Sequence, residues 1–154
     1  MGRPILGDVA VSSYWESTPR LSIEAECARR GKRAVVDGCV DLLMGRPVDD
    51  ALVFALGGPP ARRVLDGDGA DLGYWLRVWG ARGLLWAWDD SALPAILAAF
   101  GDESWRVREM AAKVVARNLV GDALAGVALL VEDPIPRVRA AAARAVVRVT
   151  DAGV

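Results

Sequence analysis

Apolar residues recur every three or four positions in two segments of the chain that share nearly the same pattern. Residues 106–118 read RVREMAAKVVARN, and residues 137–149, which begin 31 positions later, read RVRAAAARAVVRV. Such a recurrence places the apolar side chains on one face of an α-helix. The sequence therefore predicts an amphipathic helix that occurs at least twice.

A weaker third copy of this helix lies 31 positions further towards the N-terminus. The same step joins acidic, basic and small positions in all three copies. The acidic positions are Asp71, Asp102 and Asp133, and the basic positions are Arg77, Arg108 and Arg139. The small pairs are Gly80 with Ala81, Ala111 with Ala112, and Ala142 with Ala143. We expect these small pairs to let neighbouring helices approach closely, because interiors are tightly packed.

The segments between the long helices also repeat. Ser91 and Asp122 are 31 positions apart, and each is a suitable N-cap for a second, shorter helix of about three turns. Asp133 is a possible cap as well, with Pro134 in the first helical turn. One helix pair cannot bury its apolar stripe alone, so a period of 31 in helical pairs favours a stacked solenoid.

The three copies share the pattern Asp-x4-Val-Arg-x2-Ala-Ala. It occurs as DESWRVREMAA and DPIPRVRAAAA, and in weaker form as DLGYWLRVWGA. Over residues 71–150 the chain resembles the HEAT-repeat family, in particular its short bacterial repeats. The resemblance implies an all-α fold, a HEAT-like α-α superhelix of antiparallel helix pairs. The first copy departs from the pattern, because Leu76 replaces Val and Gly80 replaces Ala.

The resemblance also implies a structural role for the recurring acidic and basic positions. In that family they are framework residues that link with one another between or within repeats. Carried over, the framework comprises Asp71, Arg77, Asp102, Arg108, Asp133 and Arg139. These residues are therefore not expected to form a catalytic set.

A length of 154 residues favours a single domain. Residues 1–20 form an N-terminal segment that is expected to pack on the solenoid or extend from it. Residues 21–154 form the repeat domain. Its predicted parts are an atypical repeat 21–56 with helices at 21–45 and 50–56, a loop 57–71, regular repeats 71–101 and 102–132, and a half repeat 133–150.

Composition narrows the cellular setting. No apolar run approaches the length that spans a bilayer, and the N-terminus lacks a signal-peptide pattern, so we expect a cytoplasmic protein without a membrane partner. Lys32 and Lys113 are the only lysines, and this preference for Arg suggests a bacterial genome rich in GC. A net charge of −1 gives no global field that would attract nucleic acid or membrane.

The chain contains no histidine, which removes the usual general base and the commonest zinc ligand. We find no recognisable catalytic constellation and expect no enzyme activity and no cofactor. Cys27 and Cys39 fall within the predicted helix 21–45, too far apart along it for a disulfide. Both are expected to be buried thiols.

The predicted loop 57–71 contains DGDGAD, which suggests calcium because carboxylates are hard oxygen ligands. A calcium-binding EF-hand loop that starts at Asp66 would need Gly at its sixth position and Glu at its twelfth. Asp71 and Arg77 stand there instead. No metal site is predicted.

Basic and aromatic residues form a predicted surface stripe along the three long helices, in three parallel rows. We call it the cationic stripe. Its members are Trp75, Arg82, Trp86, Arg106, Lys113, Arg117, Arg137, Arg144 and Arg148. Such residues suit an acidic protein partner, or phosphate contacts and base stacking with nucleic acid. A structural role, in which Arg lies over Trp in internal contacts that cover the core, is the interpretation that weighs most.

Trp88, Asp89 and Asp90 form a second candidate group at the end of one long helix. The group is similar to HEAT-like DNA glycosylases that remove alkylated bases, which hold a damaged nucleotide near Trp and Asp side chains. No motif carries that activity over to this chain. A pocket that contains an Asp with a raised pKa would favour an enzyme.

The leading functional prediction is a non-catalytic interaction module or scaffold that binds an unknown protein partner. The alternatives are nucleic-acid binding through the cationic stripe and a small enzyme that acts near Trp88. We expect a monomer or a weak homo-oligomer.

Overall fold

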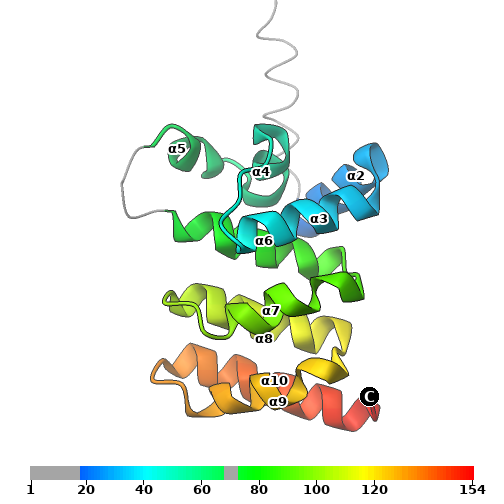
Figure 1. The fold of residues 1–154 in the computed structure, drawn as a ribbon, viewed down its shortest axis with the longest axis vertical. Helices are drawn as coiled ribbons and strands as arrows, with labels where there is room; N and C mark the ends of the chain where they lie inside the picture. The colour runs from blue at the N-terminus through cyan, green and yellow to red at the C-terminus, as the bar shows by residue number, and fades with distance from the viewer. Residues whose placement is uncertain (1–17, 68–72) are drawn as a thin grey trace, which may run out of the picture.

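The computed structural model describes residues 18–67 and 73–154, and every regular element in these ranges is a helix. The fold of the described chain is therefore all-α (Figure 1). The α-helices are α2 Pro19–Arg30, α3 Lys32–Leu43, α4 Asp50–Gly57, α5 Ala61–Leu65, α6 Tyr74–Trp86, α7 Leu93–Ala99, α8 Trp105–Asn118, α9 Leu124–Leu129 and α10 Pro136–Ala152. Short 3-10 helices are η2 Asp90–Ala92, η3 Gly121–Ala123 and η4 Leu130–Glu132.

The long helices are stacked in chain order. Helix α6 packs on α3, α8 packs on α6, and α10 packs on α8. The shorter helices form a second row, in which α7 lies against α8 and α9 lies against α10 (Figure 1). No helix of the described chain is both long and apolar enough to cross a membrane.

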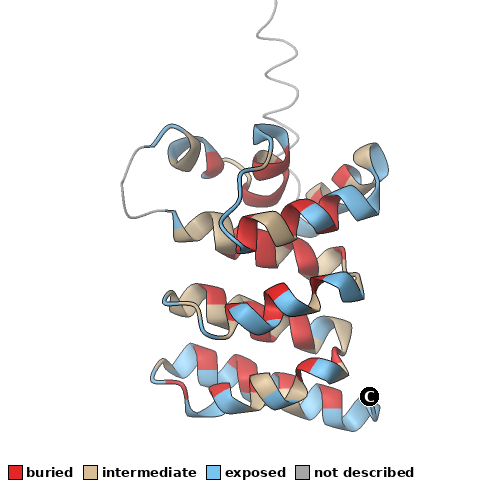
Figure 2. Ribbon diagram, in the orientation of Figure 1, coloured by how far each residue is buried: buried red, intermediate tan, exposed pale blue. Residues whose placement is uncertain are grey.

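Equivalent positions of successive long helices build the core. Val107 and Ala111 on α8 and Val138 and Ala142 on α10 are fully buried. Buried residues lie where the helices face one another, and exposed ones on the outer surfaces (Figure 2). The core is continuous from Ile23 in α2 through the stack to α10. Each helix therefore buries its apolar stripe only by packing against its neighbours.

The prediction of one helix over 21–45 is wrong. The helix is interrupted at Gly31, whose φ of 96° lies in a region that residues with a Cβ rarely adopt. Cys27 therefore belongs to α2 and Cys39 to α3, and both thiols are free. Cys39 is fully buried, and burial raises the pKa of its thiol, whereas Cys27 is only partly buried.

The predicted N-caps of the short helices are also wrong. Asp89 caps η2 instead, because its carboxylate accepts a hydrogen bond from the backbone N–H of Ser91 at 2.8 Å. Asp122 lies inside η3. Each short segment thus begins with a 3-10 helix, η2 or η3, before the α-helix starts. The α-helices α7 and α9 have only 7 and 6 residues. They are shorter than the predicted three turns.

Asp133 does not cap a helix that contains Pro134. Helix α10 begins at Pro136, and the Asp133 carboxylate accepts from the backbone N–H of Ile135 at 2.9 Å. The Asp102 carboxylate accepts from the backbone N–H of Ser104 at 2.8 Å in the same way. These side chains therefore shape the turn before each long helix.

The predicted loop 57–71 contains a helix, α5, over Ala61–Leu65. Residues 68–72, which include Asp71, lie outside the described residues. Most of the predicted segment 1–20 also lies outside them; α2 begins at Pro19, where Thr18 is the N-cap.

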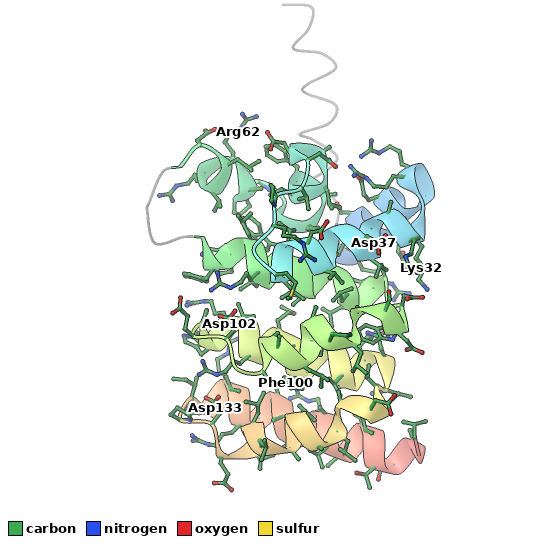
Figure 3. All side chains as sticks on the ribbon, in the orientation of Figure 1. Lys32, Asp37, Arg62, Phe100, Asp102 and Asp133 are labelled. Carbon is green, nitrogen blue, oxygen red and sulfur yellow. The ribbon has the colours of Figure 1, made fainter. Side chains whose placement is uncertain are left out.

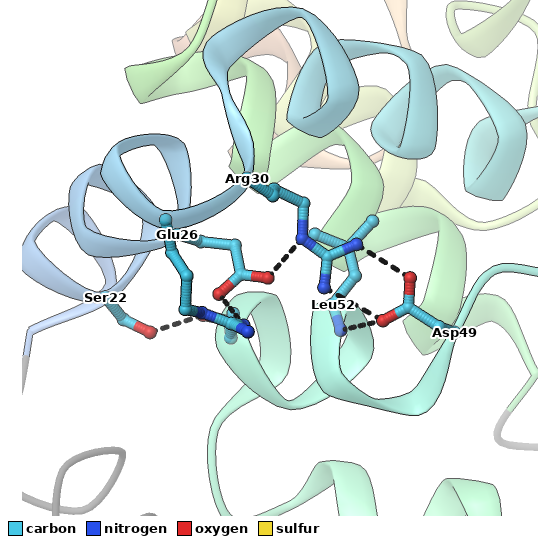
Figure 4. A network of polar contacts seen from close by, with 7 residues as sticks. Ser22, Glu26, Arg30, Asp49 and Leu52 are labelled. Carbon is cyan, nitrogen blue, oxygen red and sulfur yellow. Dashed lines mark hydrogen bonds and ion pairs between the residues drawn. The ribbon is translucent and has the colours of Figure 1, made fainter.

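A polar network joins α2 to α4 (Figure 4). Glu26, only 4% exposed, pairs with Arg29 and Arg30. The Arg30 guanidinium also donates to both oxygens of Asp49 at 2.7 and 2.9 Å. Arg30 lowers the pKa of the Asp49 carboxyl to about 2. Asp49 additionally caps α4 through the N–H of Leu52, so one carboxylate orders two elements.

The departure of the first copy from the repeat pattern has a steric reason. Helix α6 crosses α3 so closely that a Cβ at Gly80 would lie 2.8 Å from the carbonyl oxygen of Cys39. A Cβ at Gly83 would lie 2.3 Å from the Cys39 sulfur. Ala at either position would push the two helices apart.

Candidate functional site

The framework residues connect successive turns and long helices. Arg77 donates to the two carboxylate oxygens of Asp102 at 2.7 and 3.2 Å, and Arg108 donates to those of Asp133 at the same distances. Asp102 and Asp133 lie one above the other along the edge of the stack (Figure 3). Arg108 also lowers the pKa of the Asp133 carboxyl. The carboxylates of Asp102 and Asp133 are thus occupied by ion pairs.

A second set of bonds repeats on the backbone of these turns. Arg108 donates to the carbonyl oxygen of Asp102 at 2.8 Å, and Arg139 donates to that of Asp133 at 2.8 Å. Arg108 therefore joins its own turn to the next one. The equivalent residue of the first copy, Asp71, lies outside the described residues.

The cationic stripe is spread over α6, α8 and α10, which are neighbours in the stack. Helix α8 packs between the other two, so the three helices that carry the stripe lie in successive layers (Figure 1). Arg144 and Arg148 on α10 are exposed, and the Arg137 side chain is 67% exposed. Towards α6 the stripe is more buried, since Trp75 and Trp86 are only partly exposed.

Arginine and aromatic side chains alternate across the helices of the stripe. The guanidinium carbon of Arg106 lies 5.4 Å from the ring centre of Trp75 and 4.4 Å from that of Trp105. The guanidinium carbon of Arg137 lies 5.3 Å from the ring centre of the same Trp105. These distances fall within the range of cation–π attraction. The contacts fix the guanidinium groups against the helix surface.

Sequence reasoning missed the aromatic contacts made by Tyr74 and by Arg20. Tyr74 lies under Arg106 at 5.8 Å, and Arg20 of α2 lies over Trp86 at 5.1 Å. Arg117 also lies over Trp86, at 4.6 Å. Tyr74 is adjacent to the stripe member Trp75 in the sequence, whereas the approach of Arg20 depends on the packing of α2 against α6.

Glu109 is a further residue that sequence reasoning missed. It is 8% exposed, accepts a hydrogen bond from Arg137 Nε at 3.0 Å and lies 3.6 Å from Lys113 Nζ. Its position four residues before Lys113 was a readable signal, because residues at this spacing face each other on a helix. The contact with Arg137 required the packing of α10 on α8.

Arg82 differs from the other cations of the stripe. Its guanidinium is largely buried and donates one hydrogen bond to the carbonyl oxygen of Leu56 at 3.1 Å. Burial lowers the pKa of Arg82. It is therefore not an open surface cation.

A shallow cavity of about 200 Å³ lies between α8 and α10 in the cationic stripe. Its lining consists of Lys113, Ala116, Arg117, Ala141, Arg144 and Arg148. The alanines leave room for the hollow, and the four cations surround it. Within residues 18–67 and 73–154, no carboxylate forms an ion pair with Arg117, Arg144 or Arg148. We call this cavity the cationic hollow.

The group Trp88, Asp89 and Asp90 is joined by local bonds. The indole N–H of Trp88 donates to Asp90 Oδ1 at 3.1 Å. Asp89 lies 3.8 Å from an Arg33 nitrogen, and its hydrogen bonds with Ser91 lower its carboxyl pKa. The raised pKa that would favour an enzyme is thus not found at Asp89. In the described part of the chain, no group of three or more Cys, Asp or Glu side chains is arranged to hold a metal ion.

Residues 92–117 match the family model of the HEAT repeat. This segment is similar to a HEAT repeat. It contains α7 and nearly all of α8, with the framework residues Asp102 and Arg108 and the stripe members Arg106, Lys113 and Arg117. The resemblance found in the sequence is confirmed for this segment. The match begins at the short helix, so it crosses the predicted boundary between units 71–101 and 102–132.

No curated protein matches the chain, and no solved structure matches it.

Proposed function

We propose that the protein is a non-catalytic interaction module that binds an acidic segment of a protein partner through the cationic stripe. The stacked helices of the described chain, which continue the HEAT repeat on both sides, support a HEAT-like solenoid with a period of 31 residues. Solenoids of this kind offer extended, rigid surfaces to partners.

The observation that carries this proposal is the local excess of positive charge at the cationic hollow. The whole chain has a net charge of −1, yet four cations surround this cavity. In the described chain, Glu109 is the one acidic residue that forms ion pairs with stripe cations, namely Lys113 and Arg137. A surface with this local excess attracts an acidic segment even though the chain as a whole does not.

The aromatic contacts favour a protein partner over nucleic acid. Base stacking needs an open aromatic face. Arg106 already lies over Trp75 and Trp105, and Arg117 lies over Trp86. Arg and Trp are also the residues most often found at the energetic centre of protein interfaces. Guanidinium groups that are already held in place lose less entropy when a partner binds.

The test is fluorescence anisotropy with a labelled peptide of alternating Glu, Asp, Leu and Phe. The test variant is Arg144→Glu with Arg148→Glu, since both side chains are exposed and neither forms an ion pair in the described chain. We expect it to weaken binding at least about tenfold, because two attractive charges become repulsive. Binding by the native protein should also weaken as salt is raised.

The matched control is Arg33→Glu with Arg46→Glu. It changes the net charge by the same amount on exposed residues outside the stripe. Equal weakening in test and control variants would show a nonspecific charge effect and contradict the proposal. Reversal of Arg106 and Arg137 is less informative, because Arg137 pairs with buried Glu109 and its loss would leave that carboxylate unpaired.

Labelled single-stranded and duplex oligonucleotides are measured in parallel. Tight oligonucleotide binding that is lost in the test variant, with no peptide binding, would assign the stripe to nucleic acid instead. Binding of neither probe at about 50 µM protein, well above common interface dissociation constants, would remove the stripe as an anion-binding surface.

A further inference from the structure

A second cavity, of about 330 Å³, lies between the end of α4, helix α5 and helix α6. Its lining is mostly apolar, with Gly57, Val64, Trp75 and Trp79 among its walls. Arg63 and Arg82 supply the cationic groups. Ligand sites in proteins commonly have this composition, a mainly apolar cavity with a few polar groups that orient the ligand.

The aromatic wall of this cavity is preformed. Trp79 is 2% exposed, and its indole packs so tightly on Gly57 that a Cβ there would lie 2.7 Å from the ring. Trp75 stacks beside it, with ring centres 6.1 Å apart and an interplanar angle of 28°. A ligand would therefore meet two ordered indoles without a large rearrangement.

The surroundings of Arg82 indicate that the ligand is negatively charged. Its guanidinium has five N–H donors, and the structure shows one hydrogen bond, to the carbonyl of Leu56. No carboxylate of the described chain pairs with it. Among the described residues, no fully buried side-chain nitrogen or oxygen lacks a partner, so the Arg82 nitrogens without a hydrogen bond are accessible to solvent, and Arg82 lines this cavity. A largely buried cation without a counter-charge is costly, and an anion in the cavity would offset that cost.

We propose that this cavity binds a small carboxylate with an aromatic or branched apolar body. The body packs against Trp75 and Trp79, and the carboxylate accepts two hydrogen bonds from Arg82. The carboxylate comes either from a free organic acid or from the C-terminus of a peptide that ends in an apolar residue. The cavity includes Trp75 and Arg82 of the cationic stripe, but it shares no lining residue with the cationic hollow that carries the proposed function. Variants of Arg144 and Arg148 therefore test the proposed function without altering this cavity.

Isothermal titration calorimetry with 4-phenylbutyrate tests the site on the native chain. The cavity volume suits a ligand of about a dozen non-hydrogen atoms. The control ligand is 4-phenylbutan-1-ol, which keeps the body and lacks the charge. We expect saturable binding of one 4-phenylbutyrate per chain and at least about tenfold weaker binding of the alcohol. Equal affinities, or no binding of 4-phenylbutyrate at about 5 mM, would overturn the proposal.

Two variants locate the bound ligand. Arg82→Gln removes the cation and is expected to weaken the binding of 4-phenylbutyrate at least about tenfold. Its matched control is Arg117→Gln, which removes an arginine that lies over Trp86 and does not line this cavity. Val64→Trp fills the cavity and leaves Arg82 intact, so it should abolish binding even if Arg82→Gln proves unable to fold. Unchanged affinity in Val64→Trp, with a native circular dichroism spectrum, would contradict the assignment.

A peptide arm separates the two sources of the carboxylate. The probes are a hexapeptide that ends in Phe with a free carboxylate and the same peptide with a C-terminal amide. Tighter binding of the free-acid peptide than of 4-phenylbutyrate, lost on amidation, would identify a chain end as the ligand. Weaker binding of both peptides than of 4-phenylbutyrate would identify a free organic acid. Either result supports the carboxylate site.

Discussion

Arg108 donates two hydrogen bonds to the carboxylate of Asp133, which lies 25 residues further along the chain, at 2.7 and 3.2 Å. Both side chains are largely buried, with exposures of 14% and 5%. The pair therefore fixes α8 against the turn that precedes α10. Arg77 and Asp102 form the same pair one unit earlier.

The variant Arg108→Ala tests this pair. It would leave the Asp133 carboxylate buried without its guanidinium partner, and we expect the free energy of unfolding to fall by about 3 kcal/mol. Urea denaturation monitored by circular dichroism measures the change. Binding of the acidic peptide should persist in the folded variant, because Arg108 does not line the cationic hollow.

Arg139→Ala provides the control for that loss. Arg139 occupies the equivalent position but is exposed and donates only to the carbonyl oxygen of Asp133. We expect a loss of about 1 kcal/mol or less. Equal losses in the two variants would show that the carboxylate bonds of Arg108 contribute nothing beyond the backbone bond.

The Arg108–Asp133 pair also predicts a pH dependence. Arg108 lowers the folded-state pKa of Asp133, so the ionised carboxylate stabilises the fold above its unfolded pKa of about 3.9. This contribution is lost as the pH falls through the lowered folded-state pKa. The stability gap between the native protein and Asp133→Asn should therefore be constant near neutral pH and narrow below about pH 4. Denaturation series over this range measure the gap, and a constant gap would contradict the cause assigned to the pKa.

Ala142 and Ala143 test the packing of the long helices. Ala142 is fully buried, whereas the neighbouring Ala143 is exposed. Ala142→Leu adds three carbons to a packed contact, and we expect a loss of about 1–3 kcal/mol in unfolding free energy. Ala143→Leu adds the same carbons at the surface and should change stability by less than about 0.5 kcal/mol. Thermal unfolding of the two variants distinguishes these outcomes.

Gly80 tests the close crossing of α6 and α3. Alanine has the higher intrinsic helix propensity, so Gly80→Ala would stabilise an isolated helix by about 1 kcal/mol. In this protein the added Cβ would meet the backbone oxygen of Cys39, and we expect a net loss of about 1–3 kcal/mol instead. In the control Gly101→Ala the nearest atom is 3.7 Å away, an ordinary contact. A stabilised Gly80→Ala protein would contradict the crossing.

The repeated helices could be predicted because their chemistry is local. The 31-residue step reveals equivalent positions, and the family match to residues 92–117 confirms a HEAT repeat there. The repeat in the sequence already shows that the Asp and Arg positions recur together, as in Arg77 with Asp102 and Arg108 with Asp133. Boundaries were less predictable, because Gly31 interrupts a continuous helical pattern with a single backbone dihedral.

Residue types and their period thus determined that this chain builds helices with one apolar face and places cations on another. Only the tertiary structure decided which of those cations remain open. Stacking packs Arg82 against α4, places Arg106 over aromatic rings, and leaves Arg117, Arg144 and Arg148 exposed around a hollow. The physical reason is that a side chain's exposure and charge partners depend on which neighbouring helix covers it, and a helical period does not specify that neighbour.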